Sequence, residues 1–122
     1  MSKSILIVED EGIVAMDIKR TLQGFGYSVI GIVPSGEEAI EKVKNACLDL
    51  ILMNISLRGN MDGIEAVEKI HENSDIPIIY ITGHFNDELY ERAKKTKHFR
   101  YLKKPLNTEE LQKTIEAAFC KK

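Results

Sequence analysis

Two adjacent carboxylic acids, Glu9 and Asp10, follow a short apolar segment near the beginning of the chain. Like charges a few ångströms apart repel in a partly buried setting, so one expectation is that a hard cation binds to this pair. Mg²⁺ prefers oxygen ligands, usually one or two carboxylates with water, and a nearby backbone carbonyl would complete such a set. The same acids would also be favourable as N-terminal charges on a following helix. Taken alone, the pair leaves both interpretations open.

Three more polar residues stand at the ends of other apolar segments: Asn54, Thr82 and Lys104. The Thr82 hydroxyl could bond a phosphoryl oxygen, although threonine is also an ordinary β-strand residue. Lys104 supplies a compact positive charge that can pair with a carboxylate or a phosphoryl group, although an isolated lysine is usually a surface residue. Polar features at the ends of four segments together predict one site.

The elements that would position these residues are visible as short apolar runs that alternate with amphipathic segments. This alternation is typical of βα units. The expected strands are Ser4–Val8, Ser28–Val33, Leu48–Met53, Ile76–Ile81 and Arg100–Lys103, and the expected helices are Gly12–Phe25, Gly36–Asn45, Gly63–Glu72, Asp87–Lys95 and Thr108–Cys120.

Five such units predict an α/β fold with a doubly wound, five-stranded parallel sheet and helices on both faces. Each parallel return needs a crossover connection, and crossovers are right-handed. Continuous apolar runs such as 78–81 indicate strands that are buried on both faces. In sheets of this kind, sites form at the carboxyl ends of the strands, where the polar residues above are expected to meet.

Length and composition limit the possible functions. The chain has 122 residues, which predicts a single domain over 1–122 without an appended output domain. Cys47 and Cys120 have no disulfide-framework spacing, and no leader is recognised, so we expect a cytoplasmic protein with reduced thiols. The longest apolar runs are far below the roughly 20 residues that cross a bilayer, so no membrane association is expected. A net charge of −2 argues neither for a nucleic-acid binder nor for a disordered acidic tail.

The chain resembles the receiver domain of two-component response regulators over essentially its whole length. The resemblance rests on Glu9-Asp10, the run from Leu48 to Asn54, Asp62-Gly63, Thr82-Gly83 and the segment from Tyr101 to Pro105. It implies a stand-alone module with the flavodoxin-like strand order 2-1-3-4-5, which signals and is not an enzyme.

The resemblance also implies roles for individual residues. Mg²⁺ would be the cofactor, with Asp10 as a direct ligand, Glu9 acting mainly through water, and position 54 and the Ser56 carbonyl contributing oxygens. Thr82 and Lys104 would contact the phosphoryl group. Thr82 and Tyr101 would be the switch residues, with Tyr101 turning inward on activation.

Position 54 departs from this pattern, because Asn54 stands where the family has the phosphoacceptor aspartate. A carboxamide has no anionic oxygen, and its nitrogen lone pair is delocalised, so Asn54 is not expected to accept phosphate. Our preferred interpretation is an engineered, non-phosphorylatable variant of a true acceptor. The alternative is a natural, phosphorylation-independent interaction module. With Glu9, Asp10 and Lys104 charged, the cluster would carry −1 instead of −2, so Mg²⁺ should bind more weakly and the metal-free fold should be more stable.

The loop after Asn54 is a smaller departure. Many receivers have a proline four residues beyond the acceptor and a glycine eight beyond it, whereas this chain has Arg58 at the fourth position and Gly63 at the ninth. The loop is therefore one residue longer than expected. Gly59 and Gly63 are predicted to supply the backbone freedom that a tight turn needs.

The resemblance implies two kinds of partner. One is a sensor histidine kinase or phosphotransferase, and the other is a downstream protein target that docks on the face formed by Asp87–Lys95, Arg100–Lys103 and the final helix. Basic residues are concentrated between Arg92 and Lys104, which is explained by a solvated helix face or by a docking surface for an acidic partner. No DNA-reading motif is present, so direct nucleic-acid binding is not expected, and we expect a monomer or a weak homodimer.

Overall fold

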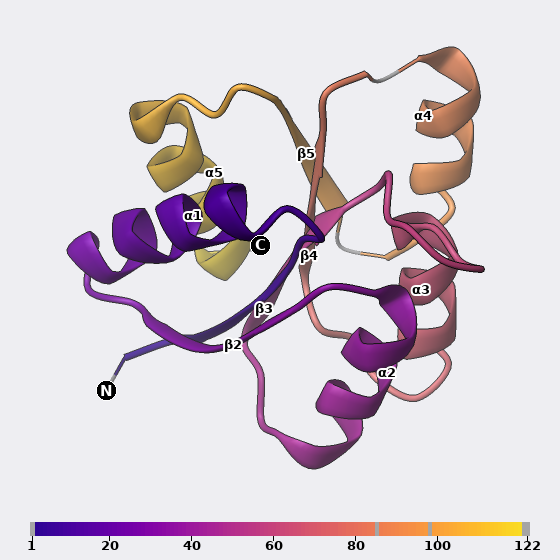
Figure 1. Cartoon of the computed structure of the whole chain (residues 1–122), viewed down its shortest axis with the longest axis horizontal. Coiled ribbons are helices and arrows are strands. Elements are labelled where there is room, and N and C mark those ends of the chain that lie inside the picture. The colour runs from indigo at the N-terminus through magenta and orange to yellow at the C-terminus, as the bar shows by residue number, and fades with distance from the viewer. Residues whose placement is uncertain (1, 85, 98, 121–122) are drawn as a thin grey trace.

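The computed structural model describes residues 2–84, 86–97 and 99–120 and shows a central parallel sheet between two layers of helices (Figure 1). The strand order is β2-β1-β3-β4-β5, which confirms the predicted doubly wound, flavodoxin-like fold. All four strand pairings are parallel. The strands are β1 (Ser4–Val8), β2 (Ser28–Val33), β3 (Leu50–Asn54), β4 (Ile78–Thr82) and β5 (Phe99–Lys103).

The helices divide between the two faces of the sheet. They are α1 (Gly12–Gly24), α2 (Gly36–Asn45), α3 (Gly63–Ile70), α4 (Asp87–Ala93) and α5 (Thr108–Cys120). Helices α1 and α5 cover one face, and α2, α3 and α4 cover the other (Figure 1). Within the described ranges, no helix combines the length and the apolar composition that crossing a bilayer would require.

Strands β3 and β4 both begin and end later than the sequence indicated. Leu48 and Asp49 lie before β3, and Ile76 and Pro77 lie before β4. The two strands instead continue by one residue to Asn54 and Thr82. Both of these polar residues are therefore part of the sheet, and both are buried.

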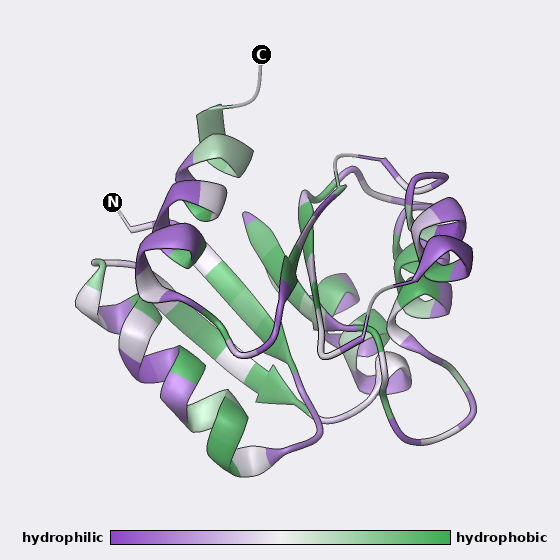
Figure 2. Ribbon diagram, turned by 90° about the horizontal axis from the view of Figure 1, so that it is seen from above, coloured by the Kyte–Doolittle hydropathy of each residue, from purple (hydrophilic) through white to green (hydrophobic). Residues whose placement is uncertain are grey.

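Alternate residues of the inner strands enter two separate apolar cores. Ile5 and Ile7 of β1 pack towards α1 and α5, whereas Leu6 and Val8 pack towards α2 and α3. The inner strands are hydrophobic along most of their length in Figure 2, and polar residues gather on the outer helix surfaces. Burial on both faces explains why these strands read as continuous apolar runs instead of alternating patterns. A rigid sheet of this kind holds its carboxyl-terminal edge in a fixed geometry.

Candidate functional site

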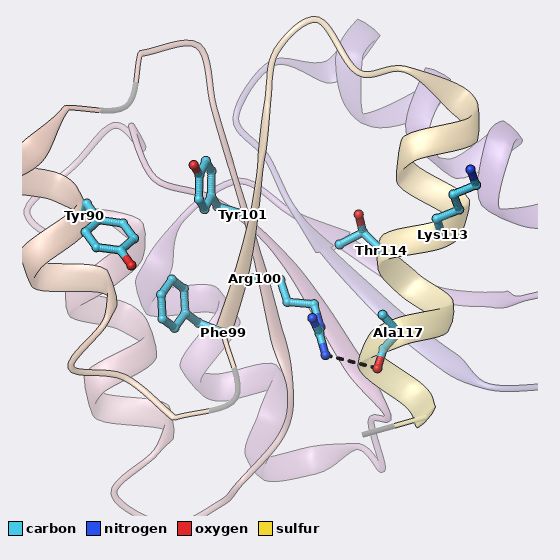
Figure 3. Close-up of a pocket in the computed structure, with 7 residues that line it drawn as sticks. All are labelled: Tyr90, Phe99, Arg100, Tyr101, Lys113, Thr114 and Ala117. Carbon is cyan, nitrogen blue, oxygen red and sulfur yellow. Dashed lines mark hydrogen bonds between the residues drawn. The ribbon is translucent and has the colours of Figure 1, made fainter. Parts of the chain in front are cut away.

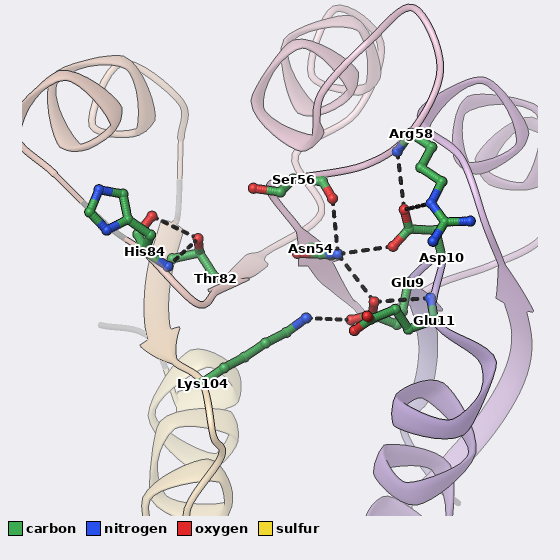
Figure 4. A network of polar contacts seen from close by, with 9 residues as sticks. All are labelled: Glu9, Asp10, Glu11, Asn54, Ser56, Arg58, Thr82, His84 and Lys104. Carbon is green, nitrogen blue, oxygen red and sulfur yellow. Dashed lines mark hydrogen bonds and ion pairs between the residues drawn. The ribbon is translucent and has the colours of Figure 1, made fainter.

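The carboxyl ends of β1, β3 and β5 bring Glu9, Asp10, Asn54 and Lys104 together (Figure 4). Parallel register pairs Val8 with Met53, which places the residues that follow these two beside each other. Backbone hydrogen bonds extend past the strands, from Glu9 N–H to Val33 O at 3.0 Å and from Lys104 N–H to Thr82 O at 2.8 Å. The hydrogen bonds of the sheet therefore fix the backbone positions from which these side chains project.

The Asn54 carboxamide lies at the centre of the cluster and is only 5% exposed. Its Nδ2 donates to Glu9 Oε2 at 3.2 Å, to Asp10 Oδ1 at 3.4 Å and to the Ser56 carbonyl at 3.3 Å. The NH₂ group has two hydrogens for three acceptor oxygens, so at least one hydrogen is shared between two acceptors. The side chain thus presents its nitrogen, and not its oxygen, to both acids.

Glu9 is the most buried acid of the site, with a side chain that is 1% exposed. Burial of a carboxylate without hydrogen-bond partners is costly, so its contacts matter. Lys104 Nζ donates to Oε1 at 3.0 Å, whereas Oε2 accepts from Asn54 and from the Glu11 N–H at 3.2 Å. Both oxygens of Glu9 are satisfied by these contacts.

Asp10 has a partner that the sequence did not suggest. Its Oδ2 accepts from the Arg58 N–H at 3.1 Å and lies 3.5 Å from Arg58 Nε. The Arg58 side chain is 83% exposed, so the ion pair itself is screened and the backbone bond is the firmer contact. A proline at position 58 would have no N–H to donate. The arginine in place of the expected proline was the feature of the sequence that could have indicated this contact.

Arg58 changes the predicted electrostatics of the cluster. Counting only Glu9, Asp10 and Lys104 gave a net negative charge, whereas the structure matches two carboxylates with two cations. All four carboxylate oxygens accept at least one hydrogen bond. The hydrogen-bonding needs of the acid pair are therefore met by the chain's own groups.

Thr82 is at the same edge of the sheet but is not bonded to the acid cluster. Its hydroxyl donates to the His84 carbonyl at 2.9 Å and accepts from the His84 N–H at 3.2 Å. Figure 4 shows this pair on the opposite side of Asn54 from the acids. Binding a phosphoryl group through Thr82 would require the hydroxyl to leave His84.

The loop between β3 and α3 is shaped by two glycines for different reasons. Gly59 has a φ of +103°, which favours glycine. Gly63 has no such φ, but a Cβ there would lie 2.3 Å from the Asn54 carbonyl oxygen. Gly63 is therefore needed because the backbone there passes too close to Asn54 for a Cβ, and not for the backbone freedom that we predicted. Its N–H also donates to the Ile55 carbonyl at 2.8 Å.

Tyr101 lies away from this cluster, on β5, and is 45% exposed. It lines a shallow pocket of about 440 Å³ between α4, β5 and α5 (Figure 3). On the α5 side of the pocket, Arg100 donates to the Ala117 carbonyl at 3.2 Å. The predicted switch residues Thr82 and Tyr101 thus lie on the neighbouring strands β4 and β5.

The predicted metal ligands fit the chemistry of Mg²⁺ only in part. The oxygens of Glu9, Asp10 and Ser56 converge on one point and are the ligand type that Mg²⁺ prefers. Asn54 does not fit as it stands, because its NH₂ group occupies that point and its hydrogens would face the cation. In the described part of the chain, no three His, Cys, Asp or Glu side chains group as a metal site.

The fold and this arrangement of strand-end residues define a receiver domain, and the chain belongs to the response regulator receiver family. The family model, described as the response regulator receiver domain, matches residues 5–116. Receiver domains are signalling modules and not enzymes, and they bind Mg²⁺ in the active site.

Two curated relatives and one solved structure illustrate the match. The transcriptional regulatory protein PdtaR of Mycobacterium tuberculosis is 33% identical over 95% of this chain and 56% of its own length. YvrH of Bacillus subtilis is 40% identical over 93% of this chain and 48% of its own length. The chain therefore spans about half the length of these relatives.

The solved structure is the receiver domain of a sensor histidine kinase from Pseudomonas aeruginosa, which has a magnesium ion coordinated in its active-site cleft. It is 27% identical, with a TM-score of 0.88, and the match covers 99% of this chain and 100% of the other.

Proposed function

We propose that this chain is a receiver built to accept a phosphoryl group from a sensor histidine kinase at position 54 with Mg²⁺ and to switch a partner-binding face, and that with Asn54 it is a variant that does not accept the group. The observation that carries the proposal is Asn54 itself, which ends β3 at the centre of the acid cluster. Phosphoryl transfer needs an anionic oxygen in line with the phosphorus. The carboxamide has no such oxygen, and its nitrogen is engaged with three acceptors.

The other site residues keep the roles proposed for them in an acceptor-bearing form. Thr82 and Lys104 would bind the phosphoryl oxygens, and Glu9, Asp10, position 54 and the Ser56 carbonyl would hold Mg²⁺. In the present chain, Lys104 is paired with Glu9 and Thr82 with the His84 backbone. A phosphoryl group would have to replace these contacts in order to bind Lys104 and Thr82.

Receiver domains interact with histidine kinases or phosphotransferases and with downstream targets. For this chain we assign the downstream contact to the face formed by α4, β5 and α5. Tyr101 and Tyr90 are exposed there beside Arg100 and Lys113, which gives an aromatic and basic surface suited to an acidic partner segment. Tyr101 and Thr82 remain the proposed switch residues, and we propose a cytoplasmic monomer or weak homodimer without direct nucleic-acid contact.

A natural, phosphorylation-independent module is the second candidate, and Arg58 favours it. Two departures from the family pattern, Asn54 and Arg58, act on the same acid: one donates to Asp10 Oδ1 and the other to Oδ2. An engineered change at position 54 alone would not account for a complementary residue at position 58.

Intact mass tests the proposal. The chain and Asn54→Asp are each incubated with Mg²⁺ and an acyl phosphate, with Asn73→Asp as a matched control because Asn73 is exposed in the turn after α3. We expect the mass of one phosphoryl group to appear on Asn54→Asp only. A phosphoryl group on the unchanged chain would contradict the proposal. If no protein is modified, the interaction module is supported and the phosphoryl-binding roles are withdrawn.

A further inference from the structure

We infer that the Asn54 carboxamide takes the place of the divalent cation as the shared partner of Glu9 and Asp10, so that the acid pair is held without metal and Mg²⁺ is excluded from the unmodified chain. This goes beyond the loss of a phosphoacceptor, because it concerns the resting state of the site. The inference rests on the proposed function in one respect, because the receiver assignment is what identifies the excluded ion as Mg²⁺.

The first observation is the convergence of oxygens on Asn54 Nδ2. Glu9 follows β1, Asp10 begins the next turn and Ser56 follows β3, yet oxygens of all three lie within 3.2 to 3.4 Å of the same nitrogen. An amide N–H carries partial positive charge and is attracted to carboxylates. Mg²⁺ binds oxygens at about 2.0–2.1 Å and would have to displace this nitrogen to reach them.

The second observation is that no carboxylate oxygen of the pair lacks a donor. Glu9 Oε1 pairs with Lys104, and Asp10 Oδ2 pairs with Arg58. The remaining two oxygens, Glu9 Oε2 and Asp10 Oδ1, both accept from Asn54. A cation entering this site would have to break these hydrogen bonds.

Rotation of the carboxamide by half a turn would present Oδ1 to the acids. Without metal, that orientation would place the Asn54 Oδ1 against the oxygens of Glu9, Asp10 and Ser56, which repel it. The two acids would also lose the hydrogen-bond donor that they share. The nitrogen-inward orientation is therefore the stable one for a buried side chain in this setting.

The variant Asn54→Ala separates this inference from a simpler explanation. If Mg²⁺ is excluded by the amide, Asn54→Ala should gain a response to Mg²⁺ through Glu9, Asp10, the Ser56 carbonyl and water. If the chain lacks affinity only because a third carboxylate is missing, Asn54→Ala should remain unresponsive. Alanine cannot accept a phosphoryl group, so this result is independent of the phosphorylation experiment.

The experiment measures melting temperature in EDTA and in increasing MgCl₂ for the chain, Asn54→Ala and the exposed control Asn73→Ala. We expect no Mg²⁺ effect on the chain or the control. Asn54→Ala should melt lower in EDTA and rise by about 5 °C when Mg²⁺ reaches about ten times its dissociation constant. Recovery of an unfolded Asn54→Ala by Mg²⁺ counts as the same gain.

A second measurement needs no variant. Mn²⁺, a paramagnetic substitute for Mg²⁺, is titrated into the ¹⁵N-labelled chain, and broadening of the amide signals of Glu9, Asp10 and Ser56 is followed. We expect no selective broadening at these residues. Selective broadening there, or an Asn54→Ala variant that stays insensitive to Mg²⁺, would overturn the inference.

Discussion

Arg92 of α4 binds Asp62 through both terminal nitrogens of its guanidinium, with Nη1–Oδ2 at 2.9 Å and Nη2–Oδ1 at 3.0 Å. Asp62 also caps α3, because its Oδ1 accepts from the Glu65 N–H and the Glu65 carboxylate accepts from the Asp62 N–H. The hydrogen bond to Asp62 is the main reason that the pKa of Arg92 is raised. The loop that leaves Asn54 is thereby tied to α4, and so to the proposed docking face.

Two substitutions of Asp62 should separate its cap from its ion pair. Asn also caps helices well, so Asp62→Asn should lose mainly the pair with Arg92, at a cost of about 0.5 kcal/mol in a partly exposed setting. Asp62→Ala should lose the cap as well and cost about 1–2 kcal/mol. Urea unfolding measures both, and equal losses would contradict a separate capping role.

Gly63→Ala should destabilise the protein by about 1–3 kcal/mol, because a Cβ would press against the Asn54 carbonyl oxygen and the Ile55 Cα. Gly24→Ala is the matched control, since a Cβ there meets nothing within 4 Å. Thermal unfolding of the two variants provides the comparison. A Gly63→Ala protein as stable as Gly24→Ala would disprove the close approach.

Thr96→Val should cost about 1–3 kcal/mol by leaving the buried Tyr80 hydroxyl without its partner. That hydroxyl lies 3.0 Å from Thr96 Oγ1, and Thr96 itself, which follows α4, donates to the carbonyl of Ala93, the last residue of that helix. Thr96→Ser keeps the hydroxyl and should lose much less. Denaturant midpoints that do not differ between valine and serine would show that the bond contributes nothing.

Asn54→Asp should be less stable than the unmodified chain when metal is removed. The aspartate would replace a donor to Glu9 and Asp10 with a third carboxylate, and like charges a few ångströms apart repel. The difference should shrink as Mg²⁺ is added. Melting in EDTA checks this expectation, and equal or higher stability of the aspartate form would count against it.

The sequence was sufficient to predict the fold because its βα alternation and apolar strands leave few other topologies. It also placed Glu9, Asp10, Asn54 and Lys104 at one edge, since parallel strands bring their carboxyl ends together. The contact between Arg58 and Asp10 could not be predicted, because it depends on the path of a loop. The inward-facing nitrogen of Asn54 depends on three acceptors from separate positions.

Strand boundaries were less accurate for a related reason. Ile76 and Leu48 are apolar, but pairing with neighbouring strands decides where β4 and β3 begin. Thr82 was expected to face a phosphoryl group, and its bonds to the His84 backbone were not visible in the pattern. Its phosphoryl-binding role remains a prediction.

Hydrogen exchange at the Asn54 side-chain amide tests the central claim most directly. Side-chain-specific ¹⁵N NMR would compare its two N–H protons with those of the exposed Asn73, in EDTA and in Mg²⁺. We predict that the Asn54 protons exchange much more slowly than those of Asn73 and that Mg²⁺ changes neither their rate nor their shift. Exchange as fast as at Asn73, or a large Mg²⁺-dependent shift confined to Asn54, would contradict an amide locked against the acid pair.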